Sequence, residues 1–155
     1  MTTYYLDTSA LIKRYVQETG TDWVRTLVAP TAGHALLTAR ITMVEVYSAL
    51  ARRRREGSVP SADCAIAVQA FAAHSATEYD FVELDLNIVT LARDLLEQHP
   101  LRAYDAVQLA SALFANQALG TAQLPLLIFL SADESLNAVA AVRGLQIDNP
   151  NLHAD

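Results

Sequence analysis

The chain has 155 residues, of which 52% are hydrophobic and 18% charged, so it suits one globular domain with a sizeable core and is neither disordered, fibrous nor low in complexity. Acids outnumber bases 17 to 11, giving a formal net charge of −6. This charge argues against a surface coated with positive charge for binding nucleic acid. It does not exclude a nuclease, because acids that bind metal ions contribute to the same count. The one cysteine, Cys64, excludes an internal disulfide and a cysteine-rich zinc site, and in its Ala-rich stretch we interpret it as a small buried residue.

No segment has the apolar length that a membrane-spanning helix needs, which is about 18 residues. The longest dense apolar run covers residues 124–130 and contains Pro125. The N-terminus reaches Asp7 after a short apolar run, too short for the core of a signal peptide. We therefore expect a cytoplasmic protein with no membrane partner and a single domain over residues 1–155.

Short apolar runs alternate with longer helical patterns along the chain. The runs predict strands at residues 4–6, 35–38, 81–84, 126–130 and 145–147. The helical patterns predict helices at residues 10–16, from 21 onward, at 42–54, 62–74 and 85–97, after Pro100, and from 131 to the glycine at 144. Strands that alternate with helices predict the α/β class, with a parallel sheet covered on both faces.

Two expected helix starts have the spacing of a capping box, in which a Ser or Thr and a Glu three residues later bond each other's backbone N–H groups. These are Thr42 with Glu45, and Ser131 with Glu134. The sequence thus offers a purely structural role for Glu45 and for Ser131.

Four acids lie in or near the first turn of an expected helix: Asp7, Glu45, Asp105 and Asp133. Each has a structural explanation, because Asp7 can cap its helix, Glu45 can complete a capping box, and the others suit the positive end of a helix. Taken one at a time, the structural explanation is favoured for all of them except Asp7.

Taken together, the four acids indicate a metal site. Asp7 and Asp133 follow two expected strands, so both should lie over the carboxyl edge of the sheet, where α/β proteins bind ligands. Two charges about 4 Å apart repel by about 4 kcal/mol at an effective dielectric near 20, so four carboxylates would need a cation. Oxygen ligands without His or Cys favour Mg²⁺ or Mn²⁺ over zinc. Such an ion activates a water and clamps phosphoryl oxygens during in-line attack.

Four sequence segments, in this order, span nearly the whole chain: YYLDTSAL at residues 4–11, TMVEV at 42–46, RAYDA at 102–106 and LSADE at 130–134. With this order and spacing the chain resembles a PIN domain and, within that group, the VapC-type toxins of bacterial toxin–antitoxin pairs. The resemblance implies a three-layer α/β/α sandwich with a mostly parallel central sheet. It also implies Mg²⁺-dependent hydrolysis of RNA by a metal-activated water, homodimers, and inhibition by a small antitoxin protein.

The resemblance also implies roles for individual residues. Asp7, Glu45, Asp105 and Asp133 match the family's four acids; the first and third carry over as the surest metal ligands, and the other two complete the pocket, in part through water.

Three hydroxyl residues beside these acids, Thr8, Ser9 and Ser131, resemble groups that support the metal ligands. For Ser131, helix capping is an equally good explanation.

The run Arg52, Arg53, Arg54, Arg55 holds four of the eleven positive charges. These side chains could grip RNA phosphates or an acidic antitoxin segment, or lie in solvent at a helix C-terminus, where cations are stabilised by the helix dipole. The sequence favours neither the binding role nor the solvent-exposed role of these arginines.

Two aromatic residues, Tyr104 and Trp23, are interpreted as core residues rather than as platforms for base stacking. Four histidines without metal-ligand spacing are interpreted as surface or packing residues, at positions 34, 74, 99 and 153.

Two other classes of function remain alternatives. The first is another Mg²⁺-dependent phosphohydrolase or a DNA-directed nuclease; a haloacid-dehalogenase phosphatase would need an Asp where Ser9 stands. The second is a non-catalytic interaction module, which would be expected to lack one or more of the four acids. The presence of all four favours the ribonuclease toxin.

Overall fold

The computed structural model describes residues 1–154 and contains one five-stranded sheet, with every neighbouring pair parallel and the order β3-β2-β1-β4-β5. The strands are β1 (Thr3–Leu6), β2 (Ala35–Ala39), β3 (Tyr79–Val82), β4 (Ile128–Leu130) and β5 (Gln146–Asp148). The predicted parallel sheet is confirmed. The strand expected at 81–84 begins two residues earlier, because Tyr79 already pairs with Leu36 of β2.

Helices connect the strands. The α-helices are α1 (Thr8–Leu11), α2 (Thr21–Val28), α3 (Ile41–Glu56), α4 (Ser61–Thr77), α5 (Leu86–Gln98), α6 (Ala103–Thr121) and α7 (Glu134–Val142). Short 3₁₀ helices lie at η1 (Ile12–Arg14), η2 (Pro30–Ala32) and η3 (Pro150–His153). The helix expected at 10–16 is thus an α-helical turn followed by a 3₁₀ turn.

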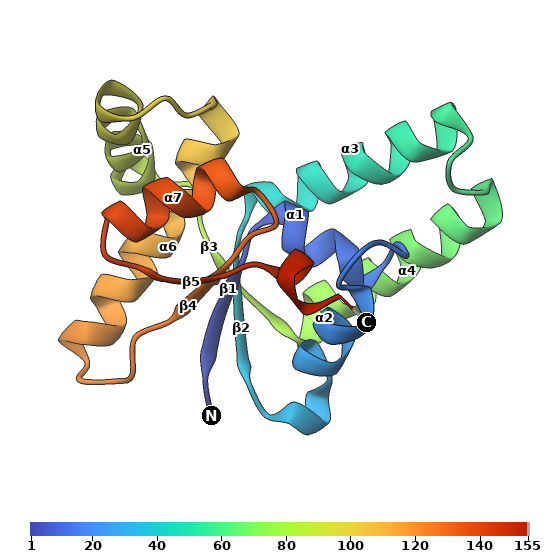
Figure 1. Cartoon of the computed structure of the whole chain (residues 1–155), viewed down its shortest axis with the longest axis horizontal. Coiled ribbons are helices and arrows are strands. Elements are labelled where there is room, and N and C mark those ends of the chain that lie inside the picture. Colours follow the sequence, from blue (N-terminus) through green and yellow to red (C-terminus); the bar gives the residue numbers. More distant parts are fainter. Residues whose placement is uncertain (155) are drawn as a thin grey trace.

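The sheet is covered on both faces, because successive residues of a strand point to opposite sides. Tyr5 and Phe129 are fully buried against α5, α6 and α7, and their rings stack at 5.6 Å. Their neighbours Leu6 and Leu130 are buried among α1, α2, α3 and α4. Figure 1 shows these two helical groups on either side of the sheet. The three-layer α/β/α sandwich is therefore confirmed.

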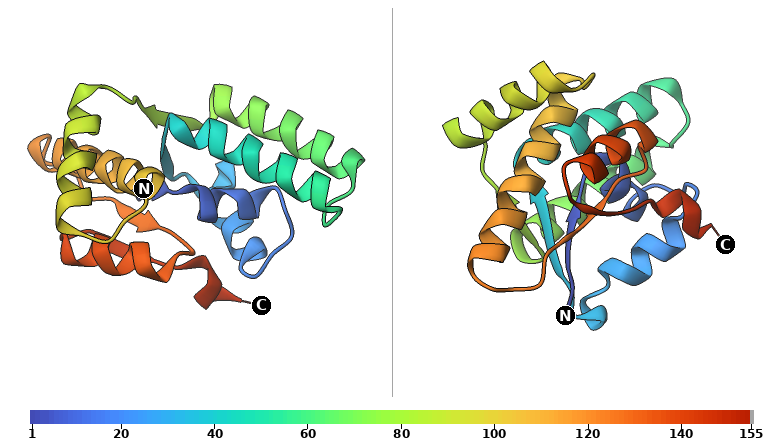
Figure 2. Two further views of the ribbon diagram at one scale, coloured as in Figure 1. Left: turned by 90° about the horizontal axis from the view of Figure 1, so that it is seen from above. Right: turned by 60° about the vertical axis from the view of Figure 1, so that its left-hand side comes forward.

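The helices α3 and α4 lie side by side and extend beyond the sheet (Figure 2). Cys64 of α4 is buried, with 3% of its surface exposed, and its thiol donates to the carbonyl oxygen of Leu50 in α3 at 3.6 Å. The interpretation of this cysteine as a small buried residue is confirmed.

The end of the described chain packs against the start of α2. The rings of Trp23 and His153 stack at 4.0 Å, and His153 Nε2 lies 2.8 Å from Asp148 Oδ1. Gly20 precedes α2 with a φ of +80°, and a Cβ there would lie 2.2 Å from the carbonyl oxygen of Pro150. Only glycine fits this position, because a side chain would push η3 off α2.

Among residues 1–154, no helix combines the length and apolar character that a membrane crossing requires.

Candidate active site

Asp7 is the first residue after β1, at the carboxyl edge of the sheet, and only 4% of its surface is exposed. It caps α1, since its Oδ1 accepts from the backbone N–H of Ala10 at 3.0 Å and from Ser9 Oγ at 2.7 Å. Its other oxygen, Oδ2, accepts from Ser131 Oγ at 2.7 Å. Three donors therefore fix this buried carboxylate in one orientation.

Ser131 reaches Asp7 because β1 and β4 are paired: Leu6 lies opposite Leu130, and the next residue of each strand lies at the same edge. The predicted capping box at Ser131 is wrong. Asp133 is the residue that caps α7, accepting from the N–H of Leu136 at 3.1 Å, and Ser131 Oγ accepts from the N–H of Asp133 at 3.1 Å. The serine thus joins two of the four acids.

Glu45 lies in the second turn of α3 and is partly buried. The predicted capping box with Thr42 is also wrong, because α3 begins at Ile41 and its first residue has no side-chain cap. Thr42 points inward and lies 2.8 Å from Thr38 Oγ1, while Glu45 Oε1 accepts from Gln108 Nε2 at 2.8 Å. The helix start is therefore not what holds Glu45.

Gln108 of α6 connects the strands to the site and was not identified from the sequence. It is 2% exposed; its Oε1 accepts from Tyr5 OH at 2.7 Å, and its Nε2 lies 2.8 Å from Thr42 Oγ1 and 3.3 Å from Thr8 Oγ1. A signal was present, because Gln108 follows Asp105 by three residues and therefore lies on the same face of the helix.

Asp105 lies in the first turn of α6, and the exposed side chain of Arg102 contacts both Asp105 and Asp133. Arg102 Nε lies 3.4 Å from Asp105 Oδ2, and its NH2 lies 4.0 Å from Asp133 Oδ2. The side chain of Arg102 is 85% exposed, so this contact is that of a surface ion pair and contributes little to stability.

All four acids line one pocket of about 220 Å³, together with residues from α1, α3 and α6; its lining is Asp7, Thr8, Ser9, Ile12, Glu45, Ala49, Arg53, Arg102, Asp105, Gln108 and Asp133. The structure thus brings together the four acids and two of the three predicted hydroxyl residues, with Ser131 directly behind Asp7. Within residues 1–154, no three His, Cys, Asp or Glu side chains already stand in a geometry that could hold a metal ion.

The pKa values of two acids in this pocket, Asp7 and Asp105, are raised. Burial raises the pKa of Asp7 to about 6; the hydrogen bonds from Ser9 and Ser131 lower it in part, and the charge of Asp105 raises it. Burial also raises the pKa of Asp105, while Arg102 lowers it and Asp133 raises it. Because the acids repel one another and little positive charge offsets them, the pocket favours a proton or a metal cation.

The donor set fits Mg²⁺ or Mn²⁺. The side chains that line the pocket offer carboxylate and hydroxyl oxygens, and neither a histidine nor a cysteine is among them. Hard divalent cations prefer such oxygens. Bringing three carboxylates onto one ion requires side-chain rotation, which the partly exposed Asp105 and Asp133 allow.

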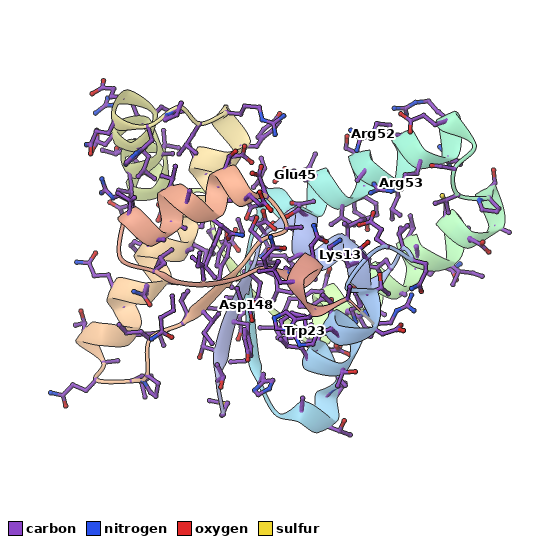
Figure 3. The ribbon with its side chains drawn as sticks, viewed as in Figure 1. Lys13, Trp23, Glu45, Arg52, Arg53 and Asp148 are labelled. Atoms are coloured by element: carbon purple, nitrogen blue, oxygen red, sulfur yellow. The ribbon has the colours of Figure 1, made fainter. Side chains whose placement is uncertain are left out.

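The four arginines predicted as one basic run point in different directions. Arg53 lines the acid pocket, and its NH2 lies 2.5 Å from Glu18, which also pairs with the buried Lys13 at 3.3 Å. Figure 3 shows Arg53 on the side of α3 toward Lys13, and Arg52 on the other side. Of the remaining two, Arg54 lines a groove shared with α4, and the exposed Arg55 lies in the last turn of α3.

The interpretation of Tyr104 as a core residue is wrong. It is 60% exposed in the first turn of α6, because neither of the two core clusters packs against it. Trp23, in contrast, is partly buried under His153, as expected.

A family model described as the PIN domain matches residues 4–142, a range that includes all four acids. The chain belongs to the PIN domain family. The predicted resemblance to this family is therefore confirmed. No curated protein matches the chain.

Several solved structures share this PIN fold. VapBC2 of Rickettsia felis, bound to a promoter DNA fragment, has a TM-score of 0.63 and 9% identity, covering 95% of this chain and 98% of that one. VapC20 of Mycobacterium tuberculosis, a toxin described as cleaving the sarcin–ricin loop, has a TM-score of 0.61 and 15% identity, covering 88% and 94%. A toxin–antitoxin complex from Klebsiella pneumoniae has a TM-score of 0.59 and 14% identity, covering 95% and 97%. At these identities, the likeness establishes the fold.

Proposed function

We propose that this PIN domain is a metal-dependent endoribonuclease and the toxin of a toxin–antitoxin pair. One observation carries the proposal: four acids from separate segments line one pocket at the carboxyl edge of the sheet, and the pKa values of Asp7 and Asp105 are raised there. Two further findings support it. One fold neighbour is named as a toxin that cleaves the sarcin–ricin loop, and another is named as a toxin–antitoxin complex.

In this proposal Asp7 and Asp105 hold Mg²⁺ or Mn²⁺, and Glu45 and Asp133 complete the set directly or through water. When bound, the ion offsets the charge of the RNA phosphate and lowers the pKa of an attacking water.

The chain's own residues orient these groups. Ser9 and Ser131 hold the Asp7 carboxylate by hydrogen bonds of 2.7 Å each. Gln108 holds Glu45 Oε1 and leaves the other carboxylate oxygen free to orient the water or take its proton. Arg53, fixed by Glu18, provides a cation at the pocket for the phosphate.

The direct test is RNA cleavage by protein purified free of antitoxin. We expect cleavage in Mg²⁺ or Mn²⁺ and none in chelator. Asp7→Asn should lower the rate at least about a hundredfold, since losing even a group that supports a metal ligand costs 10- to 100-fold. The exposed Asp80→Asn is the matched control and should cleave like wild type.

Three outcomes would contradict this function or redirect it. Chelator-resistant cleavage would exclude the metal mechanism. Hydrolysis of DNA or of a simple phosphate ester in preference to RNA would favour a different phosphohydrolase. A folded protein inactive on all three would favour a non-catalytic module.

The partner and the setting are part of the proposal. We expect a small antitoxin protein that copurifies with the chain and blocks its RNA cleavage, a homodimer, and a cytoplasmic location. Co-expression with the short open reading frame beside the gene, followed by sizing of the complex, tests the partner and the dimer together.

A further inference from the structure

A second pocket adjoins the acid pocket on the other side of Glu45. It measures about 270 Å³ and shares Thr8, Glu45 and Ala49 with the acid pocket. The rest of its lining comes from the first four turns of α3 and the first turn of α6: Ile41, Val44, Ser48, Arg52 and Tyr104. A strand of substrate that crosses the acids would therefore continue into this pocket.

Two apolar side chains in this pocket are unusually exposed. Tyr104 is 60% exposed and Val44 is 65% exposed. An aromatic ring left in solvent beside an acid pocket offers a flat face to a ligand, and every nucleobase has a π-face that stacks on such a ring.

A cation stands at the same pocket. Arg52 is exposed and, among the ion pairs within residues 1–154, has no acidic partner, whereas Arg53 on the other side is held by Glu18. A ring next to a free guanidinium matches a nucleotide, which carries a flat base and a phosphate charge.

We infer that this pocket, formed by Tyr104, Val44, Ile41 and Arg52, binds the nucleotide next to the cleaved phosphate of a single-stranded RNA. Its base stacks on Tyr104 and its phosphate pairs with Arg52. The acid pocket and the nucleotide pocket meet at Glu45, so the base held on Tyr104 sets which phosphodiester bond lies over the acids. This inference rests on the proposed function.

Binding measured apart from cleavage tests the inference. The probes are a short labelled oligoadenylate and a strand of the same length with every base removed, both in Ca²⁺, with gels showing that the oligoadenylate stays intact. Tyr104→Ala should bind oligoadenylate about tenfold more weakly and the abasic strand as wild type does, because only the stacked base is lost. Tyr104→Phe keeps the ring and should bind as wild type does.

Matched variants separate stacking from general effects. Phe114→Ala removes another exposed aromatic ring of α6, 42% exposed and almost three turns away, and should leave both strands unaffected. Arg52→Ala should weaken both strands and reduce the log–log salt slope by about 0.7, the value for one phosphate contact to a single strand. Arg55→Ala, on the same helix, should leave that slope unchanged.

Each result decides between the two proposals. If wild type cleaves RNA but Tyr104→Ala binds both strands normally, or loses both equally, the nucleotide pocket is wrong and the ribonuclease stands. If binding depends on Tyr104 and on the bases but wild type never cleaves, the ribonuclease is wrong and the pocket stands. If neither strand binds, the nucleotide pocket is wrong, and RNA cleavage alone decides whether the ribonuclease stands. If Tyr104→Ala changes the oligomeric state, the pocket is a contact between copies, and the nucleotide proposal falls.

Discussion

Two polar clusters in this protein contrast in how their charges are balanced. Five polar side chains of η1, α4, β3 and the adjoining loops contact one another beside a pocket of about 730 Å³: Arg14, Tyr15 and His74, which line the pocket, and Glu78 and Tyr79. There the arginine pairs with the glutamate at 2.7 Å and donates to a tyrosine hydroxyl at 2.7 Å. The acid pocket is smaller, and beside its four carboxylates stand one exposed cation, Arg102, and one that Glu18 already pairs, Arg53.

The pKa values reflect this difference. Burial and the nearby charge of Arg14 lower the pKa of His74, and burial raises the pKa of Tyr79, so both groups are kept neutral. In the acid pocket, burial raises the pKa of Asp7 and Asp105, and nearby acids raise both further. A satisfied network holds a fold together, whereas uncompensated charge of one sign is typical of a site that binds a cation. Pocket volume alone would have placed the active site at the cluster around Arg14, because the pocket there is larger than the acid pocket.

The largest expected effect concerns Glu45, which capping does not explain. Glu45→Gln keeps an oxygen for the Gln108 amide, so the protein should melt within a few degrees of wild type. RNA cleavage should fall about a hundredfold, since a neutral amide neither takes a proton nor orients the water as a carboxylate does. Glu97→Gln, exposed on α5, is the control for loss of one charge. Near-normal cleavage by Glu45→Gln would leave a site of three acids.

The second prediction concerns pH. The pKa of Asp7 is about 6 in the folded protein, above its ordinary value of 3.8, so folding favours the protonated form. The contribution of Asp7 to the free energy of unfolding is therefore complete below pH 4 and is lost as pH rises through 6. In chelator, Asp7→Asn should gain stability relative to wild type across this range, by about 3 kcal/mol for two pKa units.

Urea unfolding of both proteins at several pH values checks this. Because Mg²⁺ favours the charged carboxylate, saturating Mg²⁺ should shrink the gap between the two proteins. The exposed Asp80→Asn should show no such trend. If the difference in unfolding free energy between Asp7→Asn and wild type is constant with pH, burial does not raise the pKa of Asp7.

The smallest effect is expected in the balanced cluster. Glu78→Gln removes the acidic partner of Arg14, whose side chain is only 11% exposed, and should lower the free energy of unfolding by about 2 kcal/mol. RNA cleavage per folded molecule should stay at the wild-type level. A selective loss of cleavage at full stability would give this cluster a role in the reaction.

Much of the fold followed from local patterns. Apolar runs and helical periodicity predicted the parallel sheet, and the helix expected at 85–97 is present as α5, capped by Asp85. Gly144, with a φ of +91°, ends α7 at the expected place, because only glycine tolerates that conformation readily. These features depend on residues close together in the chain.

The two capping boxes show where local patterns failed. The spacing at Thr42 and at Ser131 fits a helix start, yet both hydroxyls bond residues far away in sequence, Gln108 and Asp7 respectively. A buried hydroxyl bonds whichever partner the packed strands bring to it, and spacing along one segment cannot show that partner. The exposure of Tyr104 was missed for a related reason, since it depends on which distant elements pack against the first turn of α6.

The sequence by itself determined the order of strands and helices, the family resemblance, and the identity of the four acids, because these depend on residue type and spacing. Only the tertiary structure decided that Gln108 holds Glu45, that Ser131 holds Asp7, and that Arg52 and Arg53 face different pockets. Each of these joins segments far apart in the chain, or depends on how α3 rotates against its neighbours. The packing of the two helical layers onto the sheet determines these long-range contacts and the rotation of α3.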